Sequence, residues 1–150
     1  MADSFHNLAY HVSFSTMERA RLINDELAGR PWRYLGGIVR EEGGAALAVN
    51  GASDHVHIST RLPATRAIAD AIRVVKANSL RWIHGTWTSR GRFAWRGGYA
   101  AFSVSRSLID DVAAYIARQA EHHRRVTFQD ELIAFLRRNG IEYDERYRWE

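Results

Sequence analysis

The sequence contains no cysteine, only two prolines and a single lysine, Lys76. The absence of cysteine excludes disulfides, a thiolate metal site and a cysteine nucleophile, and it is compatible with a reducing compartment. No apolar run approaches the ~20 residues that cross a bilayer. The first seven residues also lack the basic-then-apolar pattern of a signal peptide. We therefore expect a cytoplasmic protein without a membrane partner.

The composition is that of an ordered globular chain. Hydrophobic residues make up 46% and charged residues 25% of the 150 residues, which is enough for one domain, residues 1–150, with a substantial core. The net charge is +4, and all but one of the 21 basic residues are arginine. The planar guanidinium suits phosphate recognition and stacking on bases. Because GC-rich coding also produces many arginines, the charge supports a nucleic-acid partner only modestly.

The spacing of apolar residues predicts alternating strands and helices along the chain. In order, the predicted elements are a strand at 10–16, a helix at 25–42, a hairpin of strands at 45–49 and 54–62, a helix from 65, a loop at 86–98, a strand at 99–105, and helices at 107–125 and 127–139. Thr65 is expected to cap the second helix. The pairs Ser107–Asp110 and Thr127–Asp130 have the spacing of capping boxes. This order predicts an α+β, ferredoxin-like sandwich: an antiparallel sheet with helices on one face plus a C-terminal helix.

The triplet His55-Val56-His57 is the sharpest local feature. Residues two apart on a strand point to the same face, so both imidazoles project together. Two neutral imidazoles side by side commonly begin a divalent-metal site, which needs one or two further ligands. Taken alone, the triplet more often represents two histidines on a solvated strand face.

Tyr115 and Gln119 lie four residues apart on a predicted helix, and this spacing places them on one face. A tyrosine hydroxyl has an ordinary pKa near ~10, so it needs help as a nucleophile toward phosphate. A nearby cation supplies that help, and the amide oxygen of Gln119 could contribute to its shell. The alternative is structural, because a tyrosine on an apolar stripe commonly belongs to the core.

Aromatic and arginine side chains alternate in the segment 82–96, a pattern by which proteins hold single strands. Further basic residues lie on the polar edge of the preceding helix and at the end of the Tyr115 helix, where the helix dipole alone would favour them. Some of the tryptophans must belong to the core. The candidate DNA-contacting residues are Lys76, Arg81, Arg90, Arg92, Trp95, Arg96, Arg124 and Arg125.

The order of motifs resembles the IS200-like, single-tyrosine HUH transposases, including the REP-associated group. The motifs that carry this resemblance are NGASDHVHIS, KANSLRWIHG, FAWRGGYAAFSVS, YIARQAEHH and NGIEYDERY. They extend from about Tyr10 to Trp149 and follow the family's order. A histidine-hydrophobic-histidine triplet alone is weak, but its combination with a Tyr-x-x-x-Gln helix is specific.

The resemblance implies a role for each of these residues. His55, His57 and Gln119 match the ligands of a Mg²⁺ or Mn²⁺ ion, and Tyr115 matches the nucleophile that forms a 5′-phosphotyrosine link and frees a 3′-hydroxyl. It further implies a single-stranded, hairpin-containing DNA partner, a homodimer and an endonuclease that cuts and rejoins DNA. We expect such a protein to be associated with the nucleoid.

Two alternatives to this function remain at the level of sequence. His11-Val12-Ser13 and His57-Ile58-Ser59 form two His-x-Ser strands, the pattern of metal-free two-histidine phosphoesterases. In that mechanism His11 would be essential and Tyr115 irrelevant. The second alternative is a domesticated, non-catalytic protein that binds hairpin DNA.

Overall fold

The computed structural model describes residues 3–23, 29–87, 93–123 and 125–144. Within these ranges, four strands form one antiparallel sheet in the order β2-β3-β1-β4. The strands are β1 (Ala9–Ser15), β2 (Ala45–Gly51), β3 (His55–Arg61) and β4 (Ala100–Ser103). This order, with a helix between the first and second strands and another between the third and fourth, confirms the predicted ferredoxin-like α+β fold.

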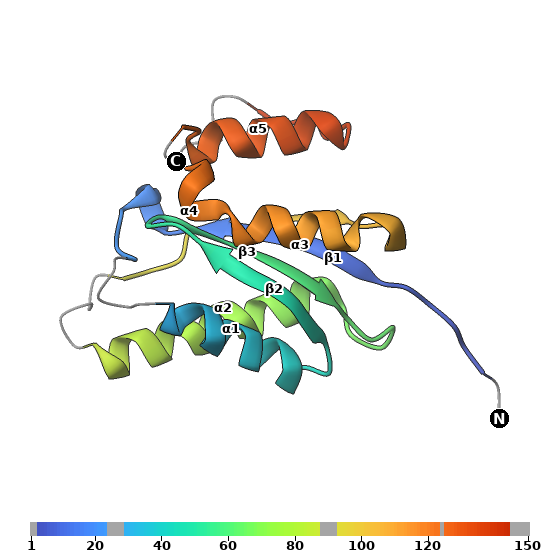
Figure 1. Ribbon diagram of the computed structural model, residues 1–150. Coiled ribbons are helices and arrows are strands. Elements are labelled where there is room, and N and C mark those ends of the chain that lie inside the picture. Colours follow the sequence, from blue (N-terminus) through green and yellow to red (C-terminus); the bar gives the residue numbers. More distant parts are fainter. Residues whose placement is uncertain (1–2, 24–28, 88–92, 124, 145–150) are drawn as a thin grey trace.

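Helices cover both faces of the sheet (Figure 1). The helices α1 (Arg30–Glu41) and α2 (Ile68–Thr86) lie on one face. The opposite face is covered by α3 (Ile109–Ala117), α4 (Gln119–His122) and α5 (Phe128–Arg138). The described residues also include the short 3₁₀ helices η1 (Met17–Arg19) and η4 (Arg106–Leu108). The C-terminal helices therefore add a third layer to the predicted two-layer sandwich. Within the described residues, no helix combines the length and hydrophobicity needed to cross a bilayer.

The central strands have two chemically different faces. Val12 of β1 and the pair Val56 and Ile58 of β3 point toward α1 and α2 and are fully buried in the main hydrophobic core. Because successive strand residues alternate between faces, the residues between them point toward α3 and α5. These are histidines and serines, among them His11 and His57. One face of each strand thus packs the core, while the other presents polar groups to a helical cover.

One of the three predicted helix caps is confirmed, and two are wrong. The side chain of Thr127 accepts a hydrogen bond from the Asp130 backbone N–H at 3.2 Å, which confirms that cap. The Thr65 cap is wrong because α2 begins at Ile68, without a side-chain cap. The Ser107 cap is also wrong, since residues 106–108 form η4 and α3 starts at Ile109. Packing against the sheet sets these starts more strongly than the local capping pattern.

Other element boundaries also differ. The helix predicted over 107–125 is interrupted at Arg118, which separates α3 from α4. The first helix begins at Arg30, with Gly29 in the left-handed conformation (φ 74°) before it and Pro31 in its first turn. Proline is tolerated there because its missing N–H has no partner within the helix. Residues 25–28 of the predicted helix lie outside the described residues.

Candidate active site

His55 and His57 project from β3 to the same face, as the sequence predicts. Both are fully buried, so a solvated pair is excluded. Strand β1 adds His11, whose Nε2 lies 2.8 Å from Nδ1 of His57. His55 is held from its other side, because its Nδ1 lies 2.8 Å from Oδ1 of Asp54. A carboxylate can only accept, so Nδ1 of His55 carries the proton and Nε2 is left with its lone pair toward the helices.

Tyr115 and Gln119 reach the same place from the helical layer. The amide oxygen of Gln119 lies 3.1 Å from Nε2 of His55, and its side chain is completely buried. Although the helix is interrupted at Arg118, the side chains of Tyr115 and Gln119 still reach the same carboxylate, that of Glu131. The side chain of Asn50 on β2 donates to the carbonyl oxygen of Ala117 at 3.2 Å, which fastens the end of α3 to the sheet. The structure therefore brings the predicted histidines, tyrosine and glutamine together.

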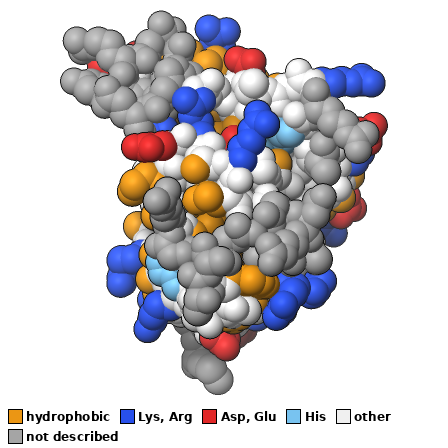
Figure 2. All heavy atoms as spheres, turned by 90° about the vertical axis from the view of Figure 1, so that its left-hand side faces the viewer, with side chains coloured by type: hydrophobic (Ala, Val, Ile, Leu, Met, Phe, Trp, Pro, Cys, Tyr) orange, Lys and Arg blue, Asp and Glu red, His pale blue; other side chains and the backbone are white. Residues whose placement is uncertain are grey.

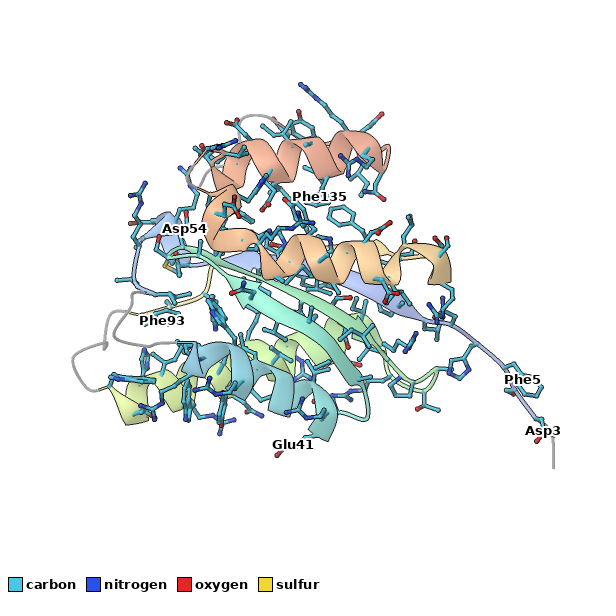
Figure 3. The ribbon with its side chains drawn as sticks, in the orientation of Figure 1. Asp3, Phe5, Glu41, Asp54, Phe93 and Phe135 are labelled. Carbon is cyan, nitrogen blue, oxygen red and sulfur yellow. The ribbon has the colours of Figure 1, made fainter. Side chains whose placement is uncertain are left out.

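Glu131 of α5 lies at the centre of these groups and was not predicted. Its Oε1 is 2.6 Å from Nε2 of His57 and 3.2 Å from Nε2 of His123. Its Oε2 accepts hydrogen bonds from the hydroxyl of Tyr115 and, at 3.3 Å, from the amide of Gln119. The residue is 3% exposed. Figure 3 shows the setting: Asp54 marks one end of the strand pair, and side chains of α5 point down toward the sheet.

A metal ion can be held by this cluster. Among the described residues, the ligand atoms of His55, His57, His123 and Glu131 all lie within 4.8 Å of one another. The amide oxygen of Gln119 lies beside this group, 3.1 Å from Nε2 of His55. Imidazole nitrogens combined with carboxylate and amide oxygens are a suitable donor set for a divalent cation. The donors thus fit the ion that the resemblance implies, with His123 and Glu131 in addition to the predicted residues.

Burial controls the charges of the site. It lowers the pKa of His57, and the hydrogen bond and charge of Glu131 offset only part of this effect. Burial and the neighbouring His57 lower the pKa of His11 to about 3. Both rings are therefore neutral at neutral pH, and a ligand must be in this state to bind a metal. Burial alone would raise the pKa of Glu131, but hydrogen bonds from His123 and His57 lower it well below its ordinary range.

Tyr115 is a protonated phenol in this environment. Burial raises the pKa of its hydroxyl above the ordinary value, and the hydrogen bond to the Glu131 carboxylate raises it further. Its hydroxyl also lies 3.1 Å from Nε2 of His122. A phenol with a raised pKa is a poor nucleophile by itself, and a cation would have to stabilise the phenolate as it forms. A cation bound by the neighbouring cluster would stabilise the phenolate in this way.

Open space borders the cluster on two sides. A cleft of about 980 Å³ beside Asp54 and His123 is also lined by Arg19, Arg21 and Trp32. A second cavity, of about 460 Å³, lies between α3 and α5 and contains Tyr115. Figure 2 faces the end of the molecule where Asp54 lies, and Lys and Arg side chains are spread over that face. A nucleic-acid strand could thus approach both the cluster and the tyrosine.

The predicted DNA-contacting residues are placed very differently from one another. Arg81 and Arg125 are exposed, and Arg96 is half-buried. Lys76 donates to the carbonyl oxygens of Arg96 and Gly98 at 2.6 and 2.8 Å, so it holds a loop. Trp95 is buried in the core, where its indole N–H donates to Ser79. Three further candidates, Arg90, Arg92 and Arg124, lie outside the described residues.

The sequence contained a signal for Glu131. Phe128, Leu132 and Phe135 lie at helical spacing around it, so a carboxylate interrupts the apolar stripe of α5. A charged residue on the buried face of a helix usually has a partner. Asp54 was detectable only through its position beside His55. His123 lies near the end of the Tyr115 helix in the sequence, but its contact with Glu131 depends on how α5 packs.

The turn that presents His55 depends on Gly51. A Cβ there would clash with the carbonyl oxygen of His55 and lie 2.9 Å from both the Trp32 ring and Cα of Val56. We expect Gly51→Ala to destabilise the protein by about 1–3 kcal/mol, as overpacking generally does. The control is Gly85→Ala on α2, where nothing lies within 4 Å of the new Cβ and alanine should stabilise the helix by up to about 1 kcal/mol. Urea denaturation of both variants measures the difference, and equal stability would refute the clash.

Comparisons with known proteins agree with this fold. The family model described as "Transposase IS200 like" matches residues 4–119. A candidate transposase from Deinococcus radiodurans R1 has a similar structure, with a TM-score of 0.66, 22% identity, and coverage of 79% of this chain and 95% of that chain. A REP-associated tyrosine transposase bound to a REP hairpin has a TM-score of 0.58, 13% identity, and coverage of 84% and 76%. No curated protein matches the sequence.

Proposed function

The chain belongs to the IS200-like transposase family and is a DNA-cleaving transposase, and from this premise we propose that it cuts single-stranded DNA through a covalent link to Tyr115. The observation that carries the proposal is the convergence of separate elements on one point. The hydroxyl of Tyr115 on α3 contacts Glu131, whose other oxygen lies 2.6 Å from a ring nitrogen of His57 on β3. A nucleophile beside a set of metal donors is what phosphate-ester cleavage by a tyrosine requires.

We propose that His55, His57 and Gln119 are ligands of a Mg²⁺ or Mn²⁺ ion. The position of Asp54 supports this, because it fixes the proton of His55 on Nδ1 and leaves Nε2 available. His11 can do the same for His57 once Nε2 of that ring is used as a ligand, since Nδ1 would then donate to His11. When bound, the ion polarises the scissile phosphate and stabilises the negative charge of the phenolate.

The proposed step is an exchange of one phosphate ester for another. The oxygen of Tyr115 forms a bond to phosphorus as the bond between phosphorus and the 3′ oxygen breaks. The phenol loses its proton to solvent, and the departing 3′ oxygen gains one and becomes a hydroxyl. The product is a 5′-phosphotyrosine link of similar energy to the original bond. Attack by a 3′-hydroxyl can therefore rejoin strands without ATP.

A hairpin-containing single strand is the substrate that we propose. The structural neighbour bound to a REP hairpin supports a hairpin partner. The exposed arginines Arg81 and Arg125 are candidate phosphate contacts, and Arg125 lines a cavity of about 400 Å³ that Tyr115 also lines. We further propose that the chain acts as a single domain in a homodimer, in the cytoplasm where chromosomal DNA lies.

The test is a covalent-adduct assay. The protein is incubated with 3′-end-labelled hairpin oligonucleotides whose single-stranded flanks are randomised, together with Mg²⁺ or Mn²⁺. We expect a labelled species that survives SDS and that EDTA abolishes, with a free 3′-hydroxyl on the released fragment. Hairpin binding without cleavage under either metal would instead indicate the non-catalytic alternative.

A further inference from the structure

We propose that Glu131 links the metal site to the nucleophile: Oε1 is a ligand of the ion, and Oε2 holds the hydroxyl of Tyr115. The inference rests on the function proposed above and adds a residue to it. The matched family region ends at residue 119, whereas α5 starts at Phe128. The family match therefore supplies no role for this glutamate, and its contacts alone indicate one.

The two carboxylate oxygens of Glu131 face different partners. Oε1 lies 2.6 Å from Nε2 of His57, 3.2 Å from Nε2 of His123 and 3.7 Å from Nε2 of His55. These are the nitrogens that would donate to an ion. Oε2 accepts from Tyr115 and lies 3.2 Å from Nε2 of His122. An ion bound among the three nitrogens would therefore be within reach of one oxygen, while the other continues to hold the phenol.

Charge supports a ligand role. Glu131 is the one carboxylate among the four clustered donors of the described residues. A buried carboxylate carries a desolvation cost that hydrogen bonds reduce, and a divalent cation would offset it further. Conversely, imidazoles alone leave both charges of the cation uncompensated in a buried site. A set of three imidazoles and one carboxylate has half the charge of the ion and includes both the nitrogen and oxygen donors that Mn²⁺ accepts.

The placement of Glu131 is fixed by the packing of α5. Phe128, one turn before it, stacks on His55 with ring centroids 4.5 Å apart and an interplanar angle of 23°. Phe135, one turn after it, packs edge-on against His11 at 4.9 Å and against Tyr115 at 5.7 Å. Figure 3 shows Phe135 in the space between α5 and the layer below it. Aromatic contacts on both sides therefore hold the carboxylate at the cluster, which a flexible surface glutamate would not achieve.

The inference makes α5 part of the catalytic geometry. The distance from the ion to the attacking oxygen would be set by one rigid carboxylate group with a partner on each side. Glu131 is then a ligand with respect to the ion and a positioning residue with respect to Tyr115. The two roles are separable, because metal binding can be measured without DNA.

The experiment measures the binding of Mn²⁺ alone to the full chain, by calorimetry and by the loss of the free-ion EPR signal. Glu131→Gln keeps the volume of the side chain, and Asp130→Asn removes the same charge from an exposed position next to it on α5. We expect Glu131→Gln to raise the Kd for Mn²⁺ at least about tenfold, as the loss of a group that supports a metal site does. Asp130→Asn should leave the Kd unchanged, and Glu131→Asp should recover part of the affinity. Urea denaturation of each variant checks that it is folded.

Four results would contradict the inference or its premise. A Kd for Glu131→Gln within twofold of the wild type would show that the carboxylate is not a ligand. If that variant also formed the DNA adduct faster than the wild type, Glu131 would be an obstacle that α5 places over Tyr115. If the wild type itself bound no Mn²⁺, the metal site of the proposed function would fail, whatever the role of Glu131. Binding that is lost in His57→Gln but kept in Glu131→Gln would reject the inference and leave the proposed function standing.

Discussion

Replacing Tyr115 by phenylalanine is expected to abolish the SDS-stable DNA adduct and to reduce strand cleavage by at least about 10³-fold, the scale on which the loss of a nucleophile acts. The change removes one oxygen and leaves the ring in its contacts with His11 and Phe135. The hydrogen bonds of the hydroxyl to Glu131 and His122 are lost. Because one of these bonds is to a buried carboxylate, the cost in stability should be about 1.5–3 kcal/mol, less than the ~5–15 kcal/mol by which domains are usually stable.

The matched control for this variant is Tyr99→Phe. Tyr99 is 41% exposed and belongs to neither the cluster nor the helices that carry it, so its removal should leave the adduct unchanged. An adduct that persists in Tyr115→Phe would assign the covalent link to another residue. Cleavage that persists there but disappears in His11→Ala would favour the metal-free two-histidine mechanism. In the structure His11 is a neutral partner of His57 with a pKa of about 3, an unsuitable state for a general acid.

Replacing His57 by glutamine is expected to weaken Mn²⁺ binding by more than about 100-fold, because the loss of a partner outside the shell already costs 10- to 100-fold. Its Nε2 lies 2.6 Å from Oε1 of Glu131, closer than the ring nitrogens of His122 and His123, and the ring is 1% exposed. The amide of glutamine can still donate a hydrogen bond to Glu131, so the buried carboxylate keeps a partner at this position. Cleavage in the adduct assay should fall in parallel with metal occupancy.

The control for this loss is His6→Gln, at an exposed residue that precedes β1. Calorimetry with Mn²⁺ and the adduct assay should both return wild-type values for it. If His57→Gln were to cleave DNA normally and bind Mn²⁺ as tightly as the wild type, His57 could not be a ligand. Excess Mn²⁺ offers a further check, since a weakened site should recover part of its activity when more of it is occupied.

Local periodicity predicted those parts of the site that depend on a single element. The alternation along β3 is enough to place His55 and His57 together, and the helical spacing is enough to pair Tyr115 with Gln119. The sheet order also followed from the sequence of elements, because short connections leave few arrangements for β-α-β-β-α-β.

Contacts between distant elements were not predictable in the same way. Glu131 meets His57 across 74 residues of chain, and no local pattern specifies how α5 docks on the strands. The helix starts at Ile68 and Ile109 were missed for a related reason. A Ser or Thr favours a cap only where the chain already turns into a helix, and tertiary packing decides where that happens.

The alternation of polar and apolar side chains along β3 also fixes the register in which this strand pairs with its neighbours. A slip of β3 by one residue against β1 would turn every side chain to the opposite face. Val56 and Ile58 would then enter the site, and both histidines would be pressed into the apolar layer beneath. Packing against α1 and α2 opposes such a slip because it would expose the two aliphatic side chains. The burial that stabilises the fold therefore also selects the strand alignment in which the metal donors face the tyrosine. A misaligned strand would lose both stability and the active site.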